Sequence, residues 1–221
     1  MDLYTSPTYF IDSDSALIQD FARNHTKRTD SPVQKAISLY YAVRDGWKYN
    51  PYSLRLNPDS FKASFVLQEQ EAHCLTKAIL LAAALRHVSI PSRLHFYQVR
   101  NHLGTSRLEE LLQSNVLVFH GATELYLDHR WRTVTPAFNR ELCDKLGVPP
   151  LEFDGFGDAI FQPYAREKGK FMEYLYDYGA FHDLPFELMV REFHQKYGDV
   201  INEFLPGDSA SFLFSDLDQA V

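Results

Sequence analysis

One apolar segment constrains the fold of this 221-residue chain more than any other feature. The segment runs from Leu75 to Leu85, is apolar on nearly every side of a helix and contains no helix-breaking residue. A helix of this kind is buried in the centre of a protein, because a surface helix keeps one polar face. Pro91 ends the segment, since the residue before a proline disfavours the α conformation. The sequence therefore predicts a buried central helix.

Cys74 stands directly before this apolar run, at the expected N-terminus of the helix. Free backbone N–H groups and the positive end of the helix dipole both favour a thiolate at that position. They are expected to lower the pKa of the thiol below its usual ~8.5. The alternative is that Cys74 is a small core residue, which is the common role of a free cysteine. The segment alone leaves both interpretations open.

The composition excludes several classes of partner. The net charge is -7 and no basic stripe is present, so a nucleic acid is not expected as a partner. No apolar run reaches the ~18 residues of a membrane span. The N-terminus is acidic and polar, which differs from a signal peptide and predicts a cytoplasmic protein. In that compartment Cys74 and Cys143 are expected to be reduced thiols.

A β-hairpin is predicted over residues 116–135, with Asp128-His129 as its two-residue turn. Alternation along the first strand puts one set of side chains on a single face. These are Val118, His120, Ala122, Glu124 and Tyr126. If Leu127 faces Arg130 across the turn, Thr135 becomes a diagonal neighbour of His120 on that face. The hairpin thus predicts that these two side chains lie within reach of each other.

The other elements are predicted from capping residues, turns and periodicity. Helices are expected at residues 16–24, 32–45, 61–68, 107–113, 139–146 and 185–197, and a strand at 94–99. After Phe138 the chain is expected to be mainly helical. The aromatic residues between 164 and 186 are interpreted as a core stripe that also covers a cleft.

The cysteine segment resembles that of the transglutaminase-like superfamily. The family pattern is a cysteine, an apolar helix, an Arg or similar residue, and a short turn into a strand. The turn here is Ser89-Ile90-Pro91-Ser92-Arg93. The family's preceding helix is matched by Lys35-Ala36, Leu39-Tyr40 and Val43-Arg44-Asp45. The resemblance extends over residues 30 to 136.

The family's histidine hairpin is matched by His120, Glu124, Trp131 and Pro136. One position departs from the pattern, because Thr135 stands where the family has an aspartate. The aspartate normally orients the imidazole and stabilises its charged form, whereas a threonine hydroxyl carries no charge.

The resemblance implies an α+β fold with a papain-like, transglutaminase-like core. In this fold a central helix bearing the cysteine packs on an antiparallel sheet bearing the histidine, here with extra N- and C-terminal helices. The expected organisation is an N-terminal extension at 1–29, the core at 30–150, and an aromatic-rich helical extension at 151–221 that packs on the core.

The resemblance also implies a cysteine enzyme that acts on amide bonds of a peptide or a small amide, by hydrolysis or acyl transfer. Cys74 would be the nucleophile, His120 would carry the proton, and Thr135 would take the third position. Asn139 is an alternative third residue, and Glu124 is expected to support the site. His102 and Trp131 complete the candidate binding residues.

No cofactor is expected. No metal site is expected either, because the cysteines and histidines lack the spacing of zinc ligands. The alternative function, motivated by Thr135, is a binding module that kept the cleft and lost efficient chemistry.

Overall fold

The structure is a computed structural model that describes residues 2–102, 106–160, 164–165, 169–170, 172–198 and 200–201. Its α-helices are α1 (Ala16–His25), α2 (Pro32–Gly46), α3 (Ala63–Val66), α4 (Cys74–His87), α5 (Ser106–Leu112), α6 (Arg140–Leu146) and α7 (Phe186–Tyr197). Its strands are β1 (Lys48–Tyr49), β2 (Glu71–Ala72), β3 (Ser92–Asn101), β4 (Val116–Leu127), β5 (Arg130–Val134), β6 (Tyr164–Ala165), β7 (Gly169–Lys170) and β8 (Met172–Phe181). Short 3-10 helices are η1 (Asp2–Tyr4), η2 (Pro51–Ser53) and η3 (Pro58–Phe61).

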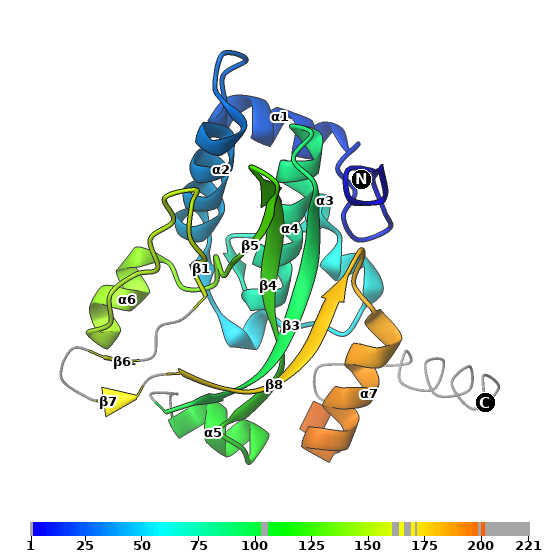
Figure 1. The fold of residues 1–221 in the computed structure, drawn as a ribbon. Coiled ribbons are helices and arrows are strands. Elements are labelled where there is room, and N and C mark those ends of the chain that lie inside the picture. Colours follow the sequence, from blue (N-terminus) through cyan, green and yellow to red (C-terminus); the bar gives the residue numbers. More distant parts are fainter. Residues whose placement is uncertain are drawn as a thin grey trace.

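A four-stranded sheet with the order β5-β4-β3-β8 forms the centre of the molecule, and α4 lies along it (Figure 1). The three neighbouring strand pairs are antiparallel. Helices α1 and α2 both pack on α4. The prediction of an α+β fold with a cysteine-bearing helix on an antiparallel sheet is therefore confirmed.

Helix α4 is buried along nearly its whole length, as its apolar sequence predicted. Every residue from Leu75 to Arg86 is buried. The Arg86 guanidinium is among them, and it donates hydrogen bonds to the carbonyls of Ser6, Ser92 and His182. A buried cation must be satisfied by acceptors, and here the acceptors come from three separate segments. Arg86 thereby ties the N-terminal segment and the end of β8 to α4.

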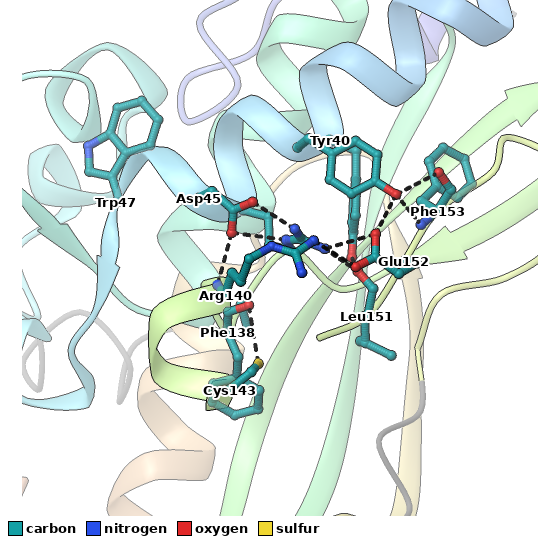
Figure 2. A network of polar contacts seen from close by, with 12 residues as sticks. Tyr40, Asp45, Trp47, Phe138, Arg140, Cys143, Leu151, Glu152 and Phe153 are labelled. Atoms are coloured by element: carbon teal, nitrogen blue, oxygen red, sulfur yellow. Dashed lines mark hydrogen bonds and ion pairs between the residues drawn. The ribbon is translucent and has the colours of Figure 1, made fainter. Parts of the chain in front are cut away.

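Helix α2 begins as its sequence predicts, with Ser31 as N-cap in a capping box with Gln34. At its other end, Figure 2 shows a polar network that joins it to the chain after β5. Arg44 pairs with Asp45 at 2.7 Å, and the backbone N–H of Arg140 donates to the other Asp45 oxygen at 2.9 Å. This network fixes the start of α6 against the end of α2.

The β4–β5 hairpin has the predicted turn and register. Asp128 and His129 have φ values of 48° and 65°, which is the backbone of a type I′ turn. Pairing runs from Leu127 with Arg130 to Thr123 with Val134. Thr135 follows directly, and its backbone N–H donates to the carbonyl of Ala159 at 2.8 Å.

A bulge in β4 lies immediately before His120. Tyr97 pairs with His120 but Val99 pairs with Leu117, so β4 has one extra residue in this interval. Phe119, inside the bulge, has a φ of 55°, which is strained for a bulky residue. The predicted alternation therefore holds from His120 onward, whereas Val118 no longer shares the face of His120.

The expectation of a mainly helical chain after Phe138 is wrong for residues 172–181. This segment is strand β8, which pairs with β3. Tyr174, Tyr176 and Tyr178 recur at the period of two residues that is typical of a strand, and aromatic residues favour strands. Because β8 belongs to the same sheet as β3 and β4, the segment after residue 150 contributes to the central sheet as well as to α7.

Candidate active site

Cys74 is the first residue of α4, as predicted. The chain reaches it through a short parallel pair in which Tyr49 lies opposite Ala72. The turn into the helix is held by Thr76, whose hydroxyl accepts from the His73 N–H at 3.2 Å and donates to the His73 carbonyl at 3.1 Å. These contacts fix the cysteine at the helix N-terminus beside β1.

Gly121 allows this end of α4 to approach β4 closely. A Cβ atom at position 121 would lie 3.0 Å from the Leu75 Cα and 3.2 Å from the Cys74 carbonyl oxygen. Further along, the Thr123 hydroxyl donates to the Ala78 carbonyl at 2.8 Å. Gly121 and Thr123 thus face α4, and His120 and Glu124 belong to the other face of the strand.

Cys74 and His120 line one cavity of about 70 Å³. The cavity lies where the strand pairing with β5, which covers Thr123 to Leu127, has ended. The cysteine is half-buried, whereas only 2% of the His120 side chain is exposed. Among the described residues, no hydrogen bond joins the Cys74 sulfur to the His120 ring. The two predicted catalytic residues therefore share a cavity without direct hydrogen bonding.

Burial controls the ionisation of both residues. Burial raises the pKa of the Cys74 thiol, although the backbone N–H groups of Gly121, Leu75 and Cys74 itself act in the opposite direction. Burial also lowers the pKa of His120 to about 4. The expected lowering of the thiol pKa by the helix N-terminus is thus outweighed by desolvation. A neutral thiol beside a neutral imidazole is the resting state that follows at pH 7.

Two of the predicted catalytic residues each carry a buried polar atom that has no hydrogen-bond partner among the described residues. They are Nδ1 of His120 and the hydroxyl oxygen of Thr135. The Thr135 hydroxyl is near enough to Tyr174 to lower the pKa of that phenol slightly, but burial dominates and raises it. A hydrogen bond between the His120 ring and the Thr135 hydroxyl would satisfy both atoms, but the structure forms none. The role of Thr135 as the third residue stays a prediction.

Lys77 is a feature of the site that the sequence did not reveal. It lies three residues after Cys74, is fully buried, and donates to the carbonyls of Arg44 at 2.7 Å, Trp47 at 3.0 Å and Ala137 at 2.9 Å. Three acceptors match the three donors of an ammonium group. Burial nevertheless lowers the pKa of Lys77 to about 7. Its bonds hold the chain before β1 and the chain after β5 against the cysteine helix.

Glu124 belongs to a separate charged cluster on the His120 face of the sheet. One of its oxygens accepts from Arg93, and the other bonds the His95 ring at 2.7 Å. The other His95 nitrogen bonds Asp177 of β8 at 2.6 Å. Burial lowers the pKa of His95, but these two carboxylates outweigh it and the net shift is upward. Glu124 is therefore occupied by Arg93 and His95 rather than by His120.

The remaining candidate residues are also bound elsewhere. The Asn139 side chain accepts from the Tyr49 N–H at 3.1 Å, and Asn139 stands at the N-cap position of α6 without a side-chain hydrogen bond to that helix. The His102 ring lies 3.2 Å from Glu173 at the far end of β3. The Trp131 ring stacks under the Arg93 guanidinium at 4.2 Å. None of these three side chains lines the cavity of Cys74 and His120.

Neither cysteine forms a disulfide, as predicted, and Cys143 is buried in α6. In the part of the chain that the structure describes, no group of three or more His, Cys, Asp or Glu side chains is arranged to hold a metal ion. Within the same residues, none of the helices has both the length and the apolar character that crossing a membrane requires.

A family model described as the transglutaminase-like superfamily matches residues 19–136, which is more than half of the 221 residues. A search of curated protein sequences gave no match. Among solved structures, the crystal structure of a "putative cysteine protease" from Cytophaga hutchinsonii matches with a TM-score of 0.46 and 18% sequence identity. That match covers 60% of this chain and 40% of the other, so this chain spans less than half of that protein's length.

Proposed function

We propose that this chain, which belongs to the transglutaminase-like superfamily, is a cysteine enzyme that acts on amide bonds through a Cys74–His120 pair. The observation that carries the proposal is the cavity that the two residues share, with the cysteine at the first turn of a buried helix. Burial lowers the pKa of His120 to about 4, so the ring is uncharged at neutral pH and is a weak base that takes the thiol proton only as the sulfur attacks.

The proposed reaction proceeds in two steps. The Cys74 sulfur attacks the carbonyl carbon as its proton passes to His120, and the Cys74 N–H stabilises the oxyanion. Collapse of this intermediate breaks the C–N bond, and His120 returns the proton to the departing amine. Water or a second amine then attacks the thioester, and the proton that it loses restores the thiol. Hydrolysis and acyl transfer differ only in this last acceptor.

The alternative is a binding module with little or no chemistry. It is favoured by Thr135, which supplies no charge to the imidazole, and by the burial that raises the pKa of the Cys74 thiol. Such a module would keep the cavity as a ligand site and use Cys74 as a packing residue.

Two measurements separate the alternatives. The first follows covalent capture of Cys74 by activated amide and ester probes in wild type, Cys74→Ala and His120→Asn. Capture should disappear in the first variant and fall at least tenfold in the second. Cys143→Ala is the matched control, because this second buried thiol lies outside the cavity, and it should behave as wild type.

The second measurement is the pH dependence of iodoacetamide alkylation at Cys74. The raised pKa predicts slow alkylation at pH 7 that increases with pH beyond the ordinary thiol range. An enzyme would nevertheless react with acylating probes at pH 7, because proton transfer to His120 accompanies attack. If acylating probes show no advantage over iodoacetamide, the binding module is the correct interpretation.

A further inference from the structure

The cavity at Cys74 is lined by side chains without formal charge at neutral pH. No Asp, Glu, Lys or Arg of the described residues contributes to it. Its apolar wall is formed by residues from η2 and its flank, α5, β4 and α7. These include Leu54, Leu108, Leu112, Leu117 and Phe193, and Ile201 after the end of α7 adds to them. An ionised group placed here would lose its hydration without gaining a counter-ion, and that loss is costly.

The polar groups of the lining are already engaged or neutral. The Tyr197 hydroxyl donates to the Val116 carbonyl at 3.1 Å and accepts from the Val118 N–H at 3.0 Å. Burial lowers the pKa of His73 to about 3, so its ring is uncharged at neutral pH. The wall beyond the catalytic pair therefore carries no formal charge at neutral pH, and its hydrogen-bonding side chains are those of Tyr49, His73 and Tyr197.

The size of the cavity limits what it can hold. An apolar cavity of ~150 Å³ accommodates benzene, which has six carbon atoms. The cavity here is about 70 Å³, which is roughly half of that volume and corresponds to about three carbon atoms on the same scale. A short aliphatic chain fits this space, whereas an aromatic ring exceeds it.

We infer that this cavity is the acyl pocket of the proposed enzyme, and that it selects an uncharged substrate with a short aliphatic chain of about three carbons beyond the reacting carbonyl. The inference rests on the proposed function, because the reacting carbonyl must sit at the Cys74 sulfur for its acyl chain to enter the cavity. The alcohol or amine portion of the substrate would remain outside.

The acyl preference can be measured from the acylation burst of p-nitrophenyl esters. The series is acetate, propanoate, butanoate and hexanoate, with the mono-ester of succinate as a charged compound of the same chain length as butanoate. The burst rate constant should rise about fourfold for each methylene up to butanoate, which corresponds to about 0.8 kcal/mol per buried CH₂. It should stop rising at hexanoate and be at least tenfold lower for the succinate ester than for butanoate.

Two substitutions at one lining residue test whether this cavity sets the preference. Leu112→Ala enlarges it and should move the preferred chain from butanoate to hexanoate. Leu112→Phe fills it and should move the preference to acetate. Leu67→Ala is the matched control, because this leucine packs on the core without lining the cavity, and its preference should remain at butanoate. Opposite shifts at one position cannot come from general loss of stability.

Binding to the Cys74→Ala variant separates this inference from the proposed function. Saturation-transfer NMR should detect binding of butanamide and not of succinamate, with the butanamide signal weakened by Leu112→Phe. If butanamide binds in this way but wild type gives no acylation burst, the preference of the cavity for a short uncharged chain stands as a binding property, and the enzyme proposal fails. If wild type reacts equally fast with the butanoate and succinate esters, the acyl pocket is refuted while the enzyme proposal survives.

Discussion

The contact between Gly121 and the first turn of α4 gives the sharpest test of how the site is built. In a Gly121→Ala variant the new methyl carbon would lie 3.0 Å from the Leu75 Cα, 3.2 Å from the Cys74 carbonyl oxygen and 3.3 Å from the Leu75 Cδ2. Two of these three atoms are backbone, so rotation of a side chain cannot relieve the contact. The helix end or the strand must move.

The size of the effect follows from the distances. Carbon atoms pack best at ~3.5–4.0 Å, so the two backbones must separate by about 0.5 Å or more. Overpacking of this kind typically costs ~1–3 kcal/mol of stability. A misplacement of ~1 Å can reduce a reaction rate about 100-fold, and half of that displacement is expected to cost about tenfold. The acylation burst at Cys74 should therefore slow by about one order of magnitude in Gly121→Ala.

The matched control is Gly46→Ala at the end of α2. A Cβ atom at position 46 has no neighbour within 4 Å, so the same chemical change meets open space. It should leave stability unchanged or raise it by ~0.4–1 kcal/mol, because alanine restricts the unfolded chain. Urea unfolding and the burst rate constant are measured for both variants and wild type. Equal stability and equal rates in the two variants would refute the close packing of α4 on β4 as the support of the cysteine.

Three further predictions concern polar residues around the sheet. Thr135→Asp should shift the alkylation profile of Cys74 to lower pH, because a carboxylate favours a charged imidazole. Thr135→Ala should leave the free energy of unfolding in urea nearly unchanged, because the hydroxyl that it removes has no hydrogen-bond partner among the described residues. Coincident alkylation profiles for wild type and Thr135→Asp would argue against the third-residue role. The pKa of His95 is raised in the folded state, so its protonated ring stabilises the fold fully below the unfolded-state pKa of ~6.5. This contribution is lost as pH rises through the folded-state pKa. The difference in unfolding free energy between wild type and His95→Gln should therefore disappear in alkaline solution. Burial lowers the pKa of Lys77 to about 7 in the folded state, whereas the unfolded state keeps this proton up to ~10.4. Between these two pH values the unfolding free energy of wild type should rise relative to that of Lys77→Met. Parallel curves of unfolding free energy against pH would mean that the ammonium stays charged on its three carbonyls.

The elements that depend on local chemistry could be predicted from the sequence. Ser31 begins α2 because a serine followed three residues later by a glutamine forms a capping box. Asp128-His129 forms the hairpin turn because both residues tolerate a positive φ. The apolar run after Cys74 must be buried, because a helix that is apolar on all sides has no face that can remain in contact with water. Each of these predictions uses residues that are close together in the chain.

The features that the sequence did not reveal depend on residues far apart in the chain. The bulge at Phe119 carries no glycine or asparagine to mark it, and it arises where β4 meets β3 in the sheet. Strand β8 needs β3 as its partner, and β3 lies about eighty residues earlier in the chain. The sequence of residues 172–181 alone therefore indicates an aromatic core stripe but not the strand. The role of Lys77 depends on three carbonyl acceptors that all come from outside its own helix. Spacing within one segment cannot predict such contacts.

The substitution of aspartate by Thr135 and the uncharged lining of the cavity have the same electrostatic consequence. With a carboxylate at position 135, a thiolate–imidazolium pair would have a compensating charge beside it. With a hydroxyl there, no carboxylate opposes the burial that raises the pKa of Cys74 and lowers that of His120. The neutral pair adds no net charge to a cavity that lacks charged side chains. An uncharged substrate could therefore enter without leaving any ion unpaired, and charge would develop only as the sulfur attacks.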